Sequence, residues 1–151
     1  MLKSIVILII VFLLVELRAQ FSIENFIDEP IKSTFEQARG KLKDKNVEQS
    51  TILNFKSLVY TETFEKIQLR IGYLFDDGNQ KGKIVQNKDE NEKDAIELFN
   101  LLQIILTKKF TDNFSKTQIG GMTLLNWRGL QDLSITLSRK GSKTILTIVK
   151  K

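Results

Sequence analysis

The chain has 151 residues, of which 42% are apolar and 27% charged, and its formal net charge is +5. This length and balance are typical of one globular domain and exclude an intrinsically disordered chain. The absence of Cys excludes disulfides, thiolate nucleophiles and metal sites built on sulfur. The absence of His removes the commonest general base and nearly every catalytic zinc site. The composition therefore favours a non-enzymatic protein, and we expect no metal and no cofactor.

The N-terminus has the pattern of a secretory signal peptide. Lys3 supplies a positive charge, Ile5–Val15 is an unbroken apolar run, and Ala19 is the small residue that a signal peptidase needs. The run is too short for a transmembrane helix, which needs about 20 apolar residues. We predict that residues 1–20 are a signal peptide and that the mature chain has no transmembrane span. An exported chain without Cys is more typical of a bacterial periplasmic or extracellular protein than of a eukaryotic secreted domain.

Apolar residues that recur at spacings of three and four predict two amphipathic helices. The first should cover Glu29–Leu42, with Phe21–Ile27 as a lead-in turn, because Pro30 is tolerated only in the first turn of a helix. The second should run from about Glu92 to Phe110, and its wide apolar arc predicts that it is covered on more than one side. The apolar positions are Ile23, Ile27, Ile31, Phe35, Ala38 and Leu42 in the first helix, and Ala95, Leu98, Phe99, Leu102, Ile105, Leu106 and Phe110 in the second.

Alternating and β-forming segments between and after these helices predict strands joined by short turns. The strands expected are Thr51–Tyr60, Lys66–Phe75, a short third strand at Lys83–Gln86, Met122–Arg128, residues 133–138 and Thr144–Val149. Asp76–Asn79 reads as a hairpin turn, since it lacks the twelve-residue ligand spacing of a calcium loop. The elements predict an α+β fold in which two helices pack on an antiparallel β-sheet, in the order helix–ββ(β)–helix–βββ. Residues 21–151 should form one domain, with residues 21–87 and 88–151 as halves of a pseudo-repeat that share this pattern.

The C-terminal half resembles a group of uncharacterised small exported bacterial proteins of unknown function. Three features carry the resemblance: the Leu-rich helix that ends in Leu106–Phe110, a following strand that contains Trp127, and a hairpin built from Ile135–Leu137 and Ile145–Ile148. The resemblance implies an exported α+β module. It carries no activity and no site residue with it.

Trp127 and Arg128 are the residues that we single out for binding. They adjoin Gly129 at the end of a predicted strand, and Trp and Arg are enriched at binding hot spots. A binding role requires the ring of Trp127 to be partly exposed, whereas packing against the second helix would place it in the core. The sequence therefore predicts an exported, non-enzymatic binding or envelope-interaction protein, whose partner is an unknown protein or envelope component.

The alternative is a small hydrolase of glycan or peptidoglycan that works without His. Such an enzyme needs two carboxylates that flank a cleft, one of them in an apolar pocket. The candidates lie at the ends of predicted strands: Glu62, Glu65, Asp77 and Asp132. Nucleic acid is not expected as a partner, because basic residues are not concentrated in any segment and export separates the chain from nucleic acid.

Overall fold

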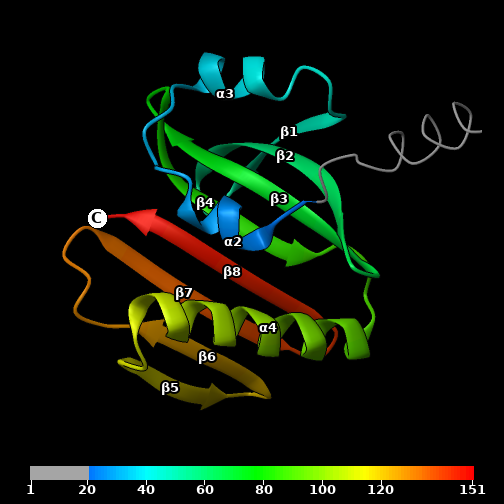
Figure 1. The fold of residues 1–151 in the computed structure, drawn as a ribbon, viewed down its shortest axis with the longest axis vertical. Coiled ribbons are helices and arrows are strands. Elements are labelled where there is room, and N and C mark those ends of the chain that lie inside the picture. The colour runs from blue at the N-terminus through cyan, green and yellow to red at the C-terminus, as the bar shows by residue number, and fades with distance from the viewer. Residues whose placement is uncertain (1–20) are drawn as a thin grey trace, which may run out of the picture.

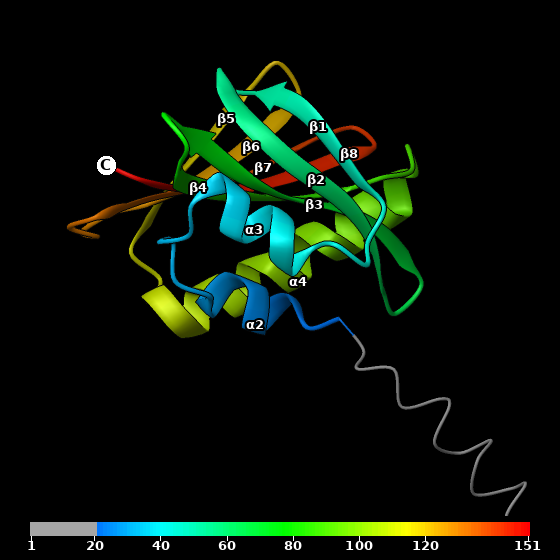
Figure 2. The same ribbon diagram turned by 90° about the horizontal axis from the view of Figure 1, so that it is seen from above.

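An eight-stranded antiparallel sheet forms the centre of the protein, and helices lie on one of its faces (Figure 1; Figure 2). The structure is a computed structural model that describes residues 21–151. The helices are α2 (Ile23–Asp28), α3 (Phe35–Lys41) and α4 (Glu92–Phe110). The strands are β1 (Val47–Ile52), β2 (Phe55–Phe64), β3 (Ile67–Asp76), β4 (Asn79–Asn87), β5 (Phe114–Ile119), β6 (Met122–Trp127), β7 (Leu133–Lys140) and β8 (Lys143–Lys150).

The sheet consists of two meanders whose last strands pair with each other. Its order is β1-β2-β3-β4-β8-β7-β6-β5, so β4 meets β8 in the middle and β1 and β5 are the two edges. Val85 of β4 lies opposite Leu146 of β8 in this central pairing. Helix α3 precedes the first meander and α4 precedes the second. The α+β class and the antiparallel sheet predicted from the sequence are therefore confirmed.

The prediction of one helix over Glu29–Leu42 after a lead-in turn at Phe21–Ile27 is wrong. The predicted turn contains the helix α2, and only Phe35–Lys41 of the predicted helix is helical, so an extended linker separates two short helices. A proline disfavours helical conformation in the residue before it, and Glu29, which precedes Pro30, has an extended backbone with ψ of 128°. The chain then starts a new helix at Thr34, which forms a capping box with Gln37. The apolar residues identified in the sequence are buried as predicted, but they are distributed over α2, the linker and α3.

Each meander contains four strands, so the predicted order helix–ββ(β)–helix–βββ is too short. The segment Thr51–Tyr60 is two strands, since β1 ends at Ile52 and β2 begins at Phe55. The turn between them consists of Leu53 and Asn54, and a Leu-Asn pair lacks the Asn-Gly or Asp-Gly signal of a tight hairpin. Strand β5 was not expected because it is a mostly exposed edge strand without a clear apolar alternation.

The main core lies between the sheet and the helices. Helix α4 has the predicted bounds, and it packs on β7 and β8 with Leu98, Leu102 and Leu106 fully buried. Because successive side chains of a strand point to opposite faces, one set of each strand's residues meets these helices and the other set points away. Within residues 21–151, no helix is long and apolar enough to cross a membrane.

Candidate binding groove

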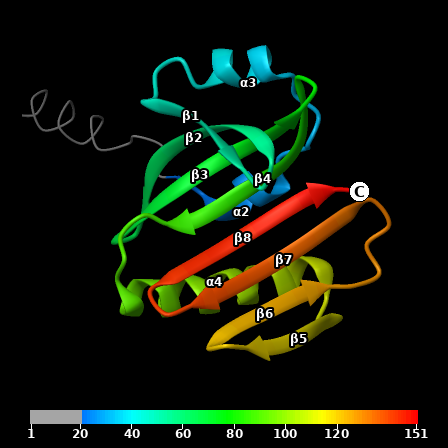
Figure 3. The same cartoon turned by 180° about the vertical axis from the view of Figure 1, so that it is seen from behind.

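Seen from behind, the sheet has no helix in front of it (Figure 3). On β5–β8 the side chains that share this uncovered face are uncharged except for Lys140 and Lys143, which pair at the end of the β7–β8 hairpin. By the pairing register, the uncharged side chains of this face are Ser115, Thr117, Ile119, Met122, Leu124, Asn126, Ser134, Thr136, Ser138, Ile145, Thr147 and Val149. When one face of an antiparallel sheet is solvated, the residues of each strand normally alternate between apolar side chains that point to the core and polar side chains that point to water. Here aliphatic side chains and uncharged polar groups share the face instead, which is the composition of a binding surface.

The first meander curls over this uncovered face. Gly72 of β3 makes the curl feasible, because a Cβ at this position would lie 2.9 Å from Cγ2 of Ile84 and 3.1 Å from Cγ2 of Val59. The side chains of β2 and β4 thus meet above β3 where a larger residue would keep them apart. As a result Val59, Leu74 and Ile84 are buried although none of the described helices covers them.

The curl creates a groove of about 480 Å³, which we call the sheet groove. It is lined by Ser50, Thr51, Ile52, Leu53, Arg70, Ile84, Gln86, Thr136, Ser138, Ile145 and Thr147. Strands β1 and β7 both contribute although β2, β3, β4 and β8 separate them in the sheet. Among the described residues that line it, only Arg70 is charged, and it is paired with Glu48, with 2.9 Å between Nη2 and Oε2. The groove therefore offers aliphatic, hydroxyl and amide groups, and it suits a ligand that is uncharged where it enters.

Leu53 stands at the rim of the groove in an unfavourable backbone conformation. Its φ is 51°, and with Asn54 at 68° it forms a tight turn in which both residues are left-handed. This conformation costs a residue with a Cβ roughly 1–2 kcal/mol. The side chain is also 61% exposed, so an apolar residue is both strained and solvated. Strain of this kind concentrates at functional sites, and Leu53 is placed to contact a ligand in the groove.

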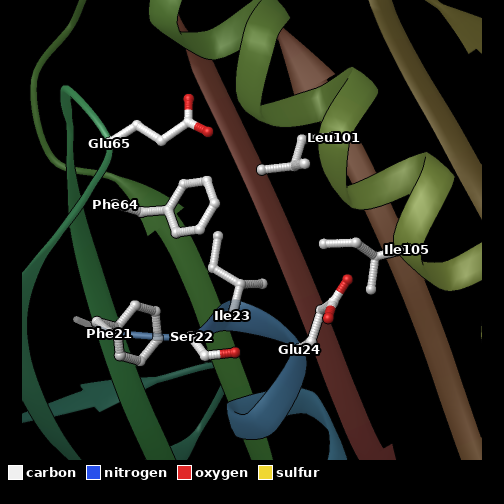
Figure 4. A pocket seen from close by; sticks show the side chains of 8 residues that line it. All are labelled: Phe21, Ser22, Ile23, Glu24, Phe64, Glu65, Leu101 and Ile105. Atoms are coloured by element: carbon white, nitrogen blue, oxygen red, sulfur yellow. The ribbon is translucent and has the colours of Figure 1, made fainter. Parts of the chain in front are cut away.

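A second pocket, of about 420 Å³, lies on the helix side between α2, α4 and the β2–β3 turn (Figure 4). Its walls are mostly apolar and come from Phe21, Ile23, Phe64, Leu101 and Ile105. The carboxylates of Glu24 and Glu65 also line it, and both residues are exposed. The pocket therefore lacks the buried acid that hydrolysis of a glycosidic bond requires.

The four carboxylates considered for a hydrolase do not converge. Glu65 lies in the β2–β3 turn and Asp77 in the β3–β4 turn, at opposite ends of the ten-residue β3. Glu62 forms an ion pair with Lys45, and the main chain of Asp132 accepts a hydrogen bond from the main-chain N–H of Lys151. None of the four lines the sheet groove. Across residues 21–151 no three acidic side chains are grouped so that they could hold a metal ion.

Trp127 belongs to the core and Arg128 to the surface. The indole is 5% exposed, its ring centroid lies 5.0 Å from that of Phe114, and Nε1 donates a hydrogen bond to the carbonyl oxygen of Thr111 at 3.0 Å. Arg128 is exposed, and its main-chain N–H donates to the carbonyl of Asn113. A partner can therefore reach Arg128 but not the ring of Trp127, and the two side chains do not form a joint surface.

A buried polar cluster on the covered face ties α2 to the sheet. Lys83 of β4 is 1% exposed, and its ammonium donates to the carbonyl oxygens of Phe26, Ile27 and Glu29 at 2.6, 2.9 and 2.5 Å. These carbonyls close α2, so Lys83 acts as an internal C-cap. Burial lowers the pKa of Lys83 to about 8, and the nearby Glu29 carboxylate partly opposes this.

The same cluster includes two tyrosines whose hydroxyls are shielded from water. Tyr73 donates a hydrogen bond to Oε2 of Glu29 at 2.7 Å, and its ring stacks on that of Tyr60 with 6.4 Å between centroids. Burial raises the pKa of Tyr60 to about 12 and raises the pKa of Tyr73 well above its usual value. Every polar side-chain atom buried within residues 21–151 has a hydrogen-bond partner. The cluster is thus a satisfied structural element rather than an open site.

Sequence reasoning missed both Lys83 and the rim residue Leu53. For Lys83 the sequence did contain a signal. Lys83 lies two residues before the apolar Val85 in β4, so the alternation of the strand places this charged side chain on the same face as Val85. For Leu53 there was no signal, because its importance depends on a turn that the pattern did not reveal. Compared with known proteins, the chain matches no family model, no curated protein and no solved structure, so the function has to be inferred from the sheet groove itself.

Proposed function

We propose that the chain is an exported, non-enzymatic binding protein and that the sheet groove is its ligand site. The observation that carries the proposal is the composition of the groove: aliphatic and hydroxyl side chains on a face that no helix of residues 21–151 covers, with its one charge already paired. Its volume of about 480 Å³ lies in the range of about 300–1,000 Å³ that is usual for ligand sites. The ligand is a protein segment or an envelope component.

The same features argue against nucleic-acid binding and against hydrolysis. Nucleic acid is held by Lys and Arg contacts to phosphate, whereas Arg70, the only cation among the described residues that line the groove, is engaged by Glu48. A hydrolase needs paired carboxylates, and within residues 21–151 no acidic side chain lines the groove. Export is supported by the signal-peptide pattern of residues 1–20, which lie outside the described part of the chain.

The groove can be tested with the neutral apolar dye N-phenyl-1-naphthylamine. Binding should raise the dye's fluorescence and shift the amide resonances of Ile84, Gln86 and Thr147. Thr147→Lys adds an unpaired charge to the groove and should weaken binding at least about tenfold, because the dye cannot pair with that charge. Ser115→Lys is the matched control, since Ser115 shares the uncovered face but lies outside the groove. Equal affinity for both variants, or resonance shifts around Phe21 instead, would contradict the proposal.

Export and the absence of catalysis need their own measurements. Protein recovered from a bacterial periplasm should have lost about 20 residues by intact mass. Full-length protein confined to the cytosol would contradict export. Incubation with peptidoglycan should release no reducing ends, and turnover that depends on Glu24 and Glu65 would favour the hydrolase instead.

A further inference from the structure

We propose that the natural ligand of the sheet groove is an extended, uncharged peptide segment that pairs with the free edge of β1 as an added strand. This inference rests on the proposed function, because it takes the groove as the ligand site. It adds the class of ligand and the main-chain groups that recognise it.

The first observation is that consecutive residues of β1 and its turn line the groove. Ser50, Thr51, Ile52 and Leu53 all contribute. Successive side chains of a strand point to opposite faces, so a cavity on one face would contact every second residue only. A cavity lined by three consecutive strand residues, Ser50–Ile52, must lie along the edge of the strand, and the sheet groove therefore adjoins the backbone of β1.

The second observation is the direction of the main-chain groups at this edge. Ile52 and Phe55 are paired across the two-residue turn, which places the N–H and C=O of Ile52 toward β2. The N–H and C=O of Thr51, one residue earlier, consequently point away from β2. Strand β1 is an edge of the sheet, and among residues 21–151 no main-chain hydrogen bond joins it to anything but β2. Thr51 thus presents a free donor and a free acceptor to the groove.

The third observation is the chemistry opposite this edge. Ile84 and Ile145 supply apolar surface, and Thr136 and Thr147 supply hydroxyls. An added strand would direct alternate side chains onto this surface while its amides pair with β1, which is the usual division between affinity and specificity in strand addition. Because a charge buried there would lack a partner, the segment must be uncharged.

The edge is also unprotected against pairing. Free edges are commonly blocked by Pro, by Lys or by bulges, whereas β1 has the sequence Val-Glu-Gln-Ser-Thr-Ile. Its one charged residue, Glu48, is held by Arg70. The exposed side chain of Leu53 lies at the end of the same edge, where it can cover an apolar residue of the added strand.

The decisive variant is Thr51→Pro, which removes the outward N–H and leaves the β1–β2 ladder intact, because proline is tolerated where an edge N–H faces outward. The probe is a blocked seven-residue peptide of alternating valine and threonine. We expect Thr51→Pro to weaken its binding at least about tenfold. Thr51→Val keeps the N–H and should bind the peptide like the unmodified protein.

Gln118→Pro is a matched control on the other edge. Gln118 precedes Ile119, which pairs with Met122 across a two-residue turn, so it occupies in β5 the position that Thr51 occupies in β1. It should leave peptide affinity unchanged within about twofold. Should Thr51→Pro fail to fold, the unmodified protein can be tested with the peptide N-methylated at alternate residues, which should bind at least about tenfold more weakly.

The outcomes separate this inference from the proposed function. If the dye binds in the groove but the peptide does not, or if Thr51→Pro binds the peptide unchanged, strand addition is wrong and the groove remains a ligand site. If neither probe binds, both proposals fail. A dimer in sedimentation experiments that Thr51→Pro converts to monomers, without peptide binding, would identify a second copy of the chain as the occupant and overturn the inference.

Discussion

The two faces of the sheet are built from the same strands but differ in how their residues are covered and paired. On the covered face the apolar side chains are packed under helices, and the buried Lys83 has three carbonyl partners. On the uncovered face the edge of β1 is free, Leu53 is strained and exposed, and the residues of β7 and β8 that line the groove are uncharged. The covered face therefore holds the main core and the buried polar cluster, whereas the groove proposed for binding lies on the other face. Substitutions on the two faces should have separable effects.

The largest effect is expected from a charge placed in the main core. Leu102 of α4 is fully buried against the sheet, so Leu102→Asp would bury an unpaired carboxylate and should cost several kcal/mol. That is enough to unfold a domain whose net stability is typically about 5–15 kcal/mol. Lys93→Ala, at an exposed position of the same helix, should change the free energy of unfolding by less than about 0.5 kcal/mol. Denaturant unfolding measures both, and similar effects would show that the covered face is misassigned.

Removal of the Lys83 ammonium should have the next largest effect. Lys83→Met fills similar space but leaves the carbonyls of Phe26, Ile27 and Glu29 without their donor. At roughly 1–3 kcal/mol for each unsatisfied group, offset by the desolvation of the charge, we expect a loss of about 2–4 kcal/mol. Hydrogen exchange should accelerate first in α2. Unchanged exchange there would mean that the ammonium does not hold the helix.

Stability should also depend on pH in a way that reports on the covered face. The pKa of Lys83 is about 8 in the folded protein and about 10.4 in an unfolded chain. Between these values the unfolded state binds more protons, so the free energy of unfolding should rise with pH. Above pH 10 it should fall, because Tyr60 and Tyr73 ionise first in the unfolded state, where their pKa values are not raised.

Chemical denaturation at several pH values tests this profile, which should have its maximum near pH 10. The slope between pH 8 and 10 should not exceed about 1.4 kcal/mol per pH unit for one proton. Lys93→Ala should leave the profile unchanged, since Lys93 is exposed. A flat profile between pH 8 and 10 would show that Lys83 keeps an ordinary pKa.

The smallest effect should be a gain in stability on the uncovered face. Asn tolerates the left-handed conformation that Leu53 adopts, so Leu53→Asn should stabilise the fold by about 0.5–1 kcal/mol. The same change removes an apolar contact from the rim and should weaken dye and peptide binding. Leu53→Ala keeps the strain and should bring no gain in stability. If Leu53→Asn lowers the melting temperature, the side chain supports the fold and is not held there for binding.

Helix α4, the antiparallel strands and the α+β class could be predicted from the sequence because they depend on local periodicity. The alternation in β3 and the wide apolar arc of α4 are visible in any window of about ten residues. The break between α2 and α3 also has a local cause and could have been predicted, because Pro30 disfavours a helical backbone at Glu29. The sequence contains no comparable signal for the Leu53–Asn54 turn, because leucine disfavours the left-handed backbone conformation that Leu53 adopts.

The groove and the buried cluster were decided by tertiary structure alone. The groove exists because Gly72 allows β2 and β4 to approach each other, which brings β1 over β7 and β8 although they are far apart in the sheet. Likewise, Lys83 is buried because α2 ends over β4 and the last carbonyls of α2 need a hydrogen-bond donor. The donor and these carbonyls are more than fifty residues apart in the sequence. Periodicity reports which face a side chain occupies, but what covers that face depends on how distant segments meet.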